Sequence, residues 1–278
     1  MRIIQSSKIK DECIKLILKA NVCVDKKTFN KLNIQKNKEN GLAKEILTQI
    51  IENDILAQKE NIPLCQDTGI AIFFLEIGQD IHIEGNLNDA INEAVKIAYT
   101  EGYFRKSVVK HPLDRINTND NTKAIIHTNI VPGDKIKITF APKGAGSENM
   151  SQIKMLVPSE GIEGVKKFVI ETIKKAGGKP CPPIIVGIGI GGNFEKCALL
   201  AKEAILRDID DTSTDPINAS LEKELLEEIN KLNIGPMGLG GKTTALAVKV
   251  NSYPCHIASL PVAVNIQCHA ARHEVIII

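Results

Sequence analysis

This chain of 278 residues lacks long apolar runs and lacks an excess of either charge. The longest apolar run, around residues 184–190, is far shorter than the ~20 residues that a transmembrane helix needs. Residues 1–5 do not begin the sustained apolar stretch of a secretory signal peptide. The formal net charge is only +2, which gives no electrostatic argument for binding nucleic acid or membranes. We therefore expect a globular protein of the cytoplasm.

Arginine is also scarce, because nearly all of the 35 basic residues are lysines. The guanidinium group is the better bidentate partner for a carboxylate, so each arginine is a candidate anion binder. There are five of them: Arg2, Arg105, Arg115, Arg207 and Arg272.

No Cys-x-x-Cys pair occurs among the seven cysteines, which argues against a zinc ribbon and against a ferredoxin-type cluster. Their odd number and irregular spacing argue against a disulfide framework. Isolated cysteine thiolates remain possible metal ligands.

Apolar residues recur with helical or strand periodicity along most of the chain. We expect helices over residues 8–20, 40–60, 87–103, 160–176, 193–206 and 218–232. We expect strands over residues 70–77, 124–130, 135–140, 184–190, 245–250 and 260–266. Strand 70–77 is apolar throughout and should be central, whereas residues 143–149 read as a glycine-rich loop. The irregular order predicts an α/β or α+β fold, with a mixed β-sheet flanked by several helices, in a single domain over residues 1–278.

Two glycine-rich segments imitate nucleotide-binding motifs. Residues 187–192 match the pattern G-x-G-x-x-G, but no strand ending in an acidic residue is predicted about 20 residues later. We therefore favour a tight strand-to-helix turn there. Residues 235–244 lack the glycine spacing of a P-loop, and two interpretations stay open: a loop whose amides bind a carboxylate, and a simple turn.

Three cysteines, Cys65, Cys181 and Cys268, adjoin predicted loops. A single cysteine is more often a small buried hydrophobe than a ligand. Cys181 lies among three prolines in residues 179–183, which fix the backbone around its thiol at low entropy cost. Such a segment suits the presentation of a ligand, and it also suits the end of a loop.

Four separated motifs occur in the same order as in the class I fumarases and tartrate dehydratases. They are Cys-Gln-Asp-Thr-Gly at 65–69, Cys-Pro-Pro at 181–183, Gly-Pro-Met-Gly-Leu-Gly-Gly at 235–241, and His-Ile-Ala-Ser-Leu-Pro at 256–261 before Cys268. The chain thus resembles this family over residues 10–275. The resemblance implies that Cys65, Cys181 and Cys268 bind a [4Fe-4S] cluster in which one iron has no protein ligand. Cys255 is the alternative ligand.

The resemblance also implies roles for the residues around that iron. Gln66 would hydrogen-bond the substrate, and Asp67 would transfer a proton at the departing hydroxyl. Arg105 would clamp a carboxylate, and Gly146 would donate its backbone amide. His256 would orient Asp67 or the bound hydroxyl, with a satisfied core histidine as the simpler alternative.

Single-chain members of the family continue into a second domain that carries further substrate-binding residues. The resemblance therefore implies a separate β subunit, together with an α homodimer or a heterotetramer. The expected activity is the reversible hydration of fumarate to L-malate, with L(+)-tartrate dehydration as the alternative. Two readings from other classes are an iron–sulfur sensor or electron-transfer subunit and a dinucleotide-binding oxidoreductase.

Overall fold

The computed structural model describes all residues from 1 to 278, and the chain forms two compact units. Unit 1 comprises residues 1–25, 53–144 and 272–278, and unit 2 comprises residues 26–52 and 145–271. Helix α3 (Gly41–Glu60) contributes residues 41–52 to unit 2 and residues 53–60 to unit 1. Compact units can still fold as one cooperative domain, so the single domain stays a prediction.

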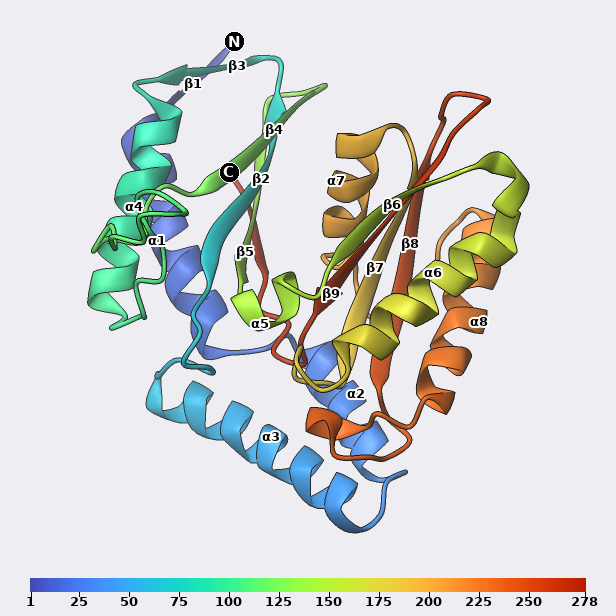
Figure 1. The fold of residues 1–278 in the computed structure, drawn as a ribbon. Coiled ribbons are helices and arrows are strands. Elements are labelled where there is room, and N and C mark those ends of the chain that lie inside the picture. The colour runs from blue at the N-terminus through green and yellow to red at the C-terminus, as the bar shows by residue number, and fades with distance from the viewer. The chain divides into compact units, whose positions relative to one another are not determined.

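Unit 1 is built on a mixed four-stranded sheet in the order β10-β5-β2-β4 (Figure 1). Its strands are β2 (Ile70–Gly78), β4 (Ile125–Val131), β5 (Ile136–Lys143) and β10 (Glu274–Ile277). Strand β2 pairs parallel with β4 and antiparallel with β5, so its predicted central position is confirmed. Two further strands, β1 (Arg2–Gln5) and β3 (Ile81–Glu84), pair with each other in parallel.

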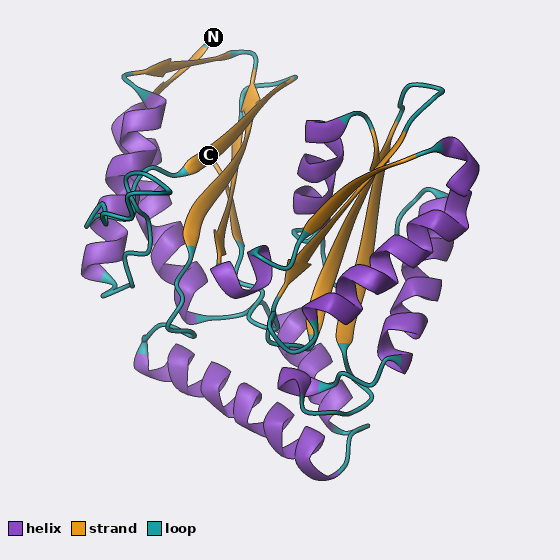
Figure 2. Ribbon diagram, in the orientation of Figure 1, coloured by secondary structure: helices purple, strands orange, loops and turns teal.

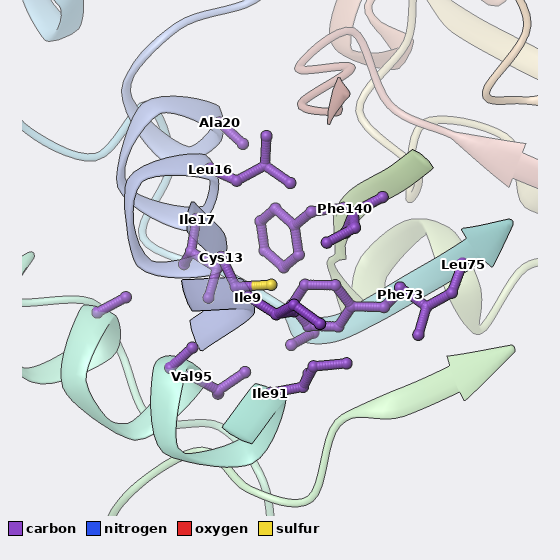
Figure 3. Packing of buried hydrophobic residues seen from close by; sticks show 14 of the residues in the cluster. Ile9, Cys13, Leu16, Ile17, Ala20, Phe73, Leu75, Ile91, Val95 and Phe140 are labelled. Atoms are coloured by element: carbon purple, nitrogen blue, oxygen red, sulfur yellow. The ribbon is translucent and has the colours of Figure 1, made fainter. Parts of the chain in front are cut away.

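The core of unit 1 lies between this sheet and the helices α1 (Ser6–Val22) and α4 (Leu87–Glu101). Figure 3 shows α1 directing Ile9, Cys13, Leu16 and Ile17 toward the rings of two sheet phenylalanines. Those phenylalanines, Phe73 and Phe140, pack with ring centroids 5.1 Å apart. Helix α4 adds side chains such as Ile91 and Val95 because its apolar residues recur every three or four positions.

Unit 2 contains a second mixed sheet in the order β6-β9-β7-β8. Its strands are β6 (Gln152–Leu156), β7 (Ile184–Gly191), β8 (Ala245–Tyr253) and β9 (Leu260–Gln267). Helices cover both faces (Figure 2): α7 (Phe194–Ala204) packs on one, and α6 (Gly161–Ala176) and α8 (Pro216–Lys231) pack on the other. The mixed sheets flanked by helices confirm the predicted fold class.

The alternation of β7 separates these two faces. Ile184, Val186 and Ile188 join the core with α6 and α8, whereas Gly187 and Gly189 face α7. A Cβ on Gly189 would lie 2.0 Å from the Cys197 carbonyl oxygen, so glycine is needed for this close packing. Helix α2 (Lys26–Lys36) and the first part of α3 form a further cluster that includes Leu32 and Leu47.

The long elements lie where the sequence predicts them, and the differences concern short segments. The sequence pattern does not predict strands β1, β3, β6 and β10 or helix α2, and residues 145–148 form a short helix, α5 (Ala145–Glu148), within the predicted loop. Helix α2 buries only Thr28 and Leu32, which is too few apolar positions to establish a helical period. None of the helices combines the length and the apolar character that crossing a membrane would require.

Candidate active site

In unit 1 the residues Cys65–Gly69 connect α3 to β2 as a loop. The side chains of Cys65 and Gln66 are exposed and that of Asp67 is half-buried. One Asp67 carboxylate oxygen, Oδ1, accepts a hydrogen bond of 3.1 Å from the Gly69 amide. A Cβ on Gly144 would lie 3.0 Å from the other oxygen, Oδ2, so this glycine leaves room for the carboxylate.

The same loop is joined to the segment that carries Arg105. The Thr68 hydroxyl donates to the Arg105 carbonyl oxygen at 2.9 Å. The Arg105 side chain is exposed and has no hydrogen-bond or ion-pair partner. Arg207, by contrast, is paired with Asp211 and Glu222. Unit 1 thus joins the backbone segments that carry three of the predicted substrate-site residues, Gln66, Asp67 and Arg105, and leaves the Arg105 side chain exposed.

In unit 2 the other two predicted cysteine ligands lie at one edge of the sheet. Cys181 precedes β7 and Cys268 follows β9, and these antiparallel strands are in register with Ile185 opposite Gln267. The two cysteine segments are hydrogen-bonded, because the His269 amide donates to the Cys181 carbonyl oxygen at 3.4 Å. Gly146 belongs to the same neighbourhood, since a Cβ there would lie 3.4 Å from the Lys179 carbonyl oxygen.

The glycine-rich segment 235–241 packs against the Cys181 segment. The Met237 amide donates to the Pro182 carbonyl oxygen at 2.8 Å, and a Cβ on Gly238 would lie 2.5 Å from the Gly178 Cα. The amides of Gly238, Leu239 and Gly240 donate to carbonyl oxygens of residues 234–236, and the Gly235 amide donates to the Thr244 hydroxyl. This supports the simple-turn interpretation over a carboxylate-binding loop and gives the turn a task, which is to hold the Cys181 backbone.

His256 lies at the opposite edge of the same sheet, in the connection from β8 to β9. Strand β9 has eight residues, so His256 lies about 25 Å from Cys268 along the strand. Its ring is exposed, and its Nδ1 accepts a hydrogen bond from the Ala258 amide. The expected neighbourhood of His256 and the cysteine ligands is therefore not found within unit 2, and a satisfied core histidine is excluded too.

Cys255 shares this distant position, which argues against it as an alternative to Cys268. It is exposed, and its thiol lies 3.4 Å from the Ser259 carbonyl oxygen. A pocket of about 440 Å³ beside Cys255 and His256 is lined mainly by apolar side chains such as Ile162 and Ile217. Such a lining does not suit a charged dicarboxylate.

The three remaining cysteines are structural. Burial raises the pKa of Cys13 to about 12, and burial also raises the pKa of Cys23 and of Cys197. A thiol that stays protonated is a poor metal ligand, because metals bind the thiolate. Within neither unit do three His, Cys, Asp or Glu side chains converge on a metal-sized site. The three predicted ligands are divided, with Cys65 in unit 1 and Cys181 and Cys268 in unit 2.

Residues 187–191 of the G-x-G-x-x-G segment form the end of strand β7, and only Gly192 lies in the turn to α7, so the turn is shorter than the sequence predicts. The next element after α7 is the helix α8, so the acidic strand end of a dinucleotide site is absent. The dinucleotide-binding interpretation is therefore not supported.

Sequence reasoning missed the residues that hold the loop 65–69. Arg272 donates from Nη2 to the Asp67 carbonyl oxygen at 2.8 Å, and Tyr99 and Asn121 donate to the carbonyls of Thr68 and Gly69. The available signal was the scarcity of arginine together with the position of Arg272 four residues after Cys268.

Comparisons with known proteins agree with these motifs. Residues 10–277 match the family model described as fumarate hydratase (Fumerase). The chain is 47% identical over 276 residues to the "Putative L(+)-tartrate dehydratase subunit alpha" of Methanocaldococcus jannaschii, covering 96% of both chains. It is 35% identical over 254 residues to the L(+)-tartrate dehydratase subunit alpha of Escherichia coli K12, covering 90% of this chain and 84% of the relative. The chain belongs to the fumarate hydratase (Fumerase) family.

Proposed function

We propose that this chain is the α subunit of an iron–sulfur hydro-lyase that dehydrates a four-carbon 2-hydroxy dicarboxylate. The observation that carries the proposal is the loop Cys65–Asp67, which presents two exposed side chains and a half-buried carboxylate. Through Thr68 the loop is hydrogen-bonded to the backbone of Arg105, whose side chain is exposed. The names of similar chains favour L(+)-tartrate as the substrate. The sequence motifs alone led us to expect fumarate and L-malate first, with L(+)-tartrate as the alternative. Hydration of fumarate is the second candidate, supported by the description of the family.

Cys65, Cys181 and Cys268 are the proposed ligands of a [4Fe-4S] cluster. The donor set fits, because all three cysteines lie at loop positions outside any disulfide and none is part of a hydrophobic core. Three thiolates leave one iron of a cubane cluster open, whereas four would suit electron transfer. When bound, such a cluster supplies a Lewis acid for the hydroxyl that leaves.

The chain's own residues then bind the dianion and move one proton. Arg105 binds one carboxylate through two parallel hydrogen bonds, and the Gly146 amide and Gln66 bind further oxygens. Asp67 donates a proton to the hydroxyl leaving C2, so that water departs while C3 loses a proton to a base. That base is proposed to lie on a separate β subunit.

His256 fits this proposal only through a second copy of the chain. It lies one strand length from Cys268 within its own sheet, which is too far for contact with a substrate held there. We therefore assign His256 to the site of a neighbouring α subunit, in an α homodimer or a heterotetramer.

Steady-state kinetics of the anaerobically reconstituted chain, with and without its β partner, test the proposal. We expect turnover of L(+)-tartrate to a 2-oxo acid by the pair, weaker turnover of L-malate, and almost none by the single chain. Preference for L-malate would move the assignment to fumarate hydratase. A loaded cluster with no turnover of either substrate, and no spectroscopic change when they are added, would favour the sensor or electron-transfer reading.

A further inference from the structure

The loop 65–69 is held by a set of polar side chains that lie entirely inside unit 1. Five such side chains are almost fully buried: Asn21, Thr68, Tyr99, Asn121 and Arg272. Burying a polar group costs free energy unless it is hydrogen-bonded. Here the bonds converge on one short segment, so the buried polar groups specify the conformation of that loop rather than general stability.

Arg272 is the charged member of this set and is only 3% exposed. Its Nη2 donates to the Asp67 carbonyl oxygen at 2.8 Å, and its Nη1 donates to the Asn21 side-chain oxygen at 3.3 Å. Asn21 in turn accepts the Leu64 amide at its backbone oxygen, at 3.0 Å. The planar guanidinium thus fixes the backbone on both sides of Cys65 and Gln66, which a lysine ammonium could not do with the same geometry.

Asn121 is fully buried and bridges two segments of the candidate site. Its Nδ2 donates to the Gly69 carbonyl oxygen at 3.2 Å, and its Oδ1 accepts from the Ser107 amide at 2.8 Å. Ser107 lies two residues after Arg105, so Asn121 holds the backbone that follows Arg105. The Thr68 hydroxyl holds the carbonyl group of Arg105 itself.

We propose that Arg272 and Asn121 are positioning residues with separate tasks. Arg272 sets the direction of the Asp67 side chain by holding the Asp67 carbonyl, and Asn121 sets the place of the Arg105 guanidinium. The roles of Asp67 and Arg105 in this inference rest on the proposed function. Neither positioning residue touches the substrate, because both side chains are buried inside unit 1.

The two tasks predict effects on different kinetic constants. Misplacing a proton donor by about 1 Å costs up to ~100-fold in rate, so Arg272→Lys lowers kcat at least ~10-fold with KM changed less than ~3-fold. Asn121→Gly keeps the positive φ of 63° but removes both hydrogen bonds, and it raises KM about 10-fold with a smaller effect on kcat. Arg207→Lys is the matched control, since it weakens a paired arginine of unit 2 and leaves both constants unchanged.

Amide hydrogen exchange on the chain itself gives a readout that does not depend on turnover. Arg272→Lys should speed exchange at residues 65–69, Asn121→Gly should speed it at Ser107, and Arg207→Lys should affect neither. If the wild-type pair turns over neither dicarboxylate, the proposed function fails, and exchange alone decides whether these residues order the loop. The inference is overturned if kcat and KM move together in both variants in proportion to lost thermal stability, or if exchange at 65–69 and at Ser107 is unchanged.

Discussion

At the scale of single residues, the loop 65–69 separates the tasks of backbone and side chain. Its carbonyl groups accept hydrogen bonds from Tyr99, Asn121 and Arg272, all of which are buried. The side chains of Cys65 and Gln66 point outward and are exposed. The interior therefore fixes the loop while leaving the two side chains available to a ligand.

Asp54 shows the opposite situation, a buried carboxyl group without compensation. It is 3% exposed, and neither of its oxygens has a hydrogen-bond partner. Burial raises the pKa of Asp54 from 3.8 to about 7. The folded chain therefore holds this proton between about pH 4 and pH 7, where the unfolded chain has lost it, so the Asp54 contribution to stability falls as pH rises through this window.

Asp54→Asn tests this directly. The substitution removes the ionisation, so we expect Tm to depend less on pH between about 4 and 7 and the variant to be more stable at pH 8 by roughly 1–3 kcal/mol. Thermal unfolding at several pH values measures both. If Tm of the variant depended on pH as Tm of the wild type does, the Asp54 carboxyl group would be hydrogen-bonded in solution and its pKa would not be raised.

At the scale of elements, the segment around Cys181 depends on contact between two backbones. Gly178 and Gly238 approach so closely that a Cβ on Gly178 would lie 3.0 Å from the Gly238 Cα and from the Met237 carbonyl oxygen. The glycine-rich turn thereby supports the backbone that presents Cys181.

Gly178→Ala should push this turn away from the Cys181 segment. Overpacking of this kind costs about 1–3 kcal/mol, and we expect a lower Tm together with a lower iron content after reconstitution. Lys175→Ala is the control, because Lys175 is exposed in the last turn of α6 and its substitution leaves the contact between Gly178 and Gly238 in place. Equal iron content in both variants would show that the glycine-rich turn does not contribute to cluster binding.

Sequence patterns predict the elements in which apolar residues recur regularly over many positions. They fail where a segment is held in place by residues that are distant in the sequence. Helix α4 buries six residues with regular spacing and is predicted. Helix α2 buries only two, so the same periodicity does not predict it. Motifs indicate Cys65 and Asp67, but the arginine that holds Asp67 lies 205 residues later in the chain. No local pattern reveals such a contact. The predicted strand over residues 260–266, by contrast, already lies between His256 and Cys268, so their separation follows from the sequence once the length of that strand is considered.

At the scale of the whole molecule, the position of His256 makes an assembly of chains part of the proposal. If His256 serves the site of a neighbouring copy, His256→Asn and Asp67→Asn damage different halves of the same site. Co-refolding the two inactive variants should then restore about a quarter of wild-type activity, because random pairing gives one intact site in half of the dimers. Separate refolding followed by the same assay is the control. No recovery, with mixed dimers demonstrated, would remove His256 from catalysis.

The most direct test of the central claim is the iron and sulfide content of the anaerobically reconstituted chain and its cysteine variants. We predict about four irons and four sulfides per wild-type chain, as a [4Fe-4S] cluster requires. Cys65→Ser, Cys181→Ser and Cys268→Ser should each lose the cluster, whereas Cys255→Ser should retain it because Cys255 lies at the opposite edge of the sheet. Retention in Cys181→Ser together with loss in Cys255→Ser would contradict the account.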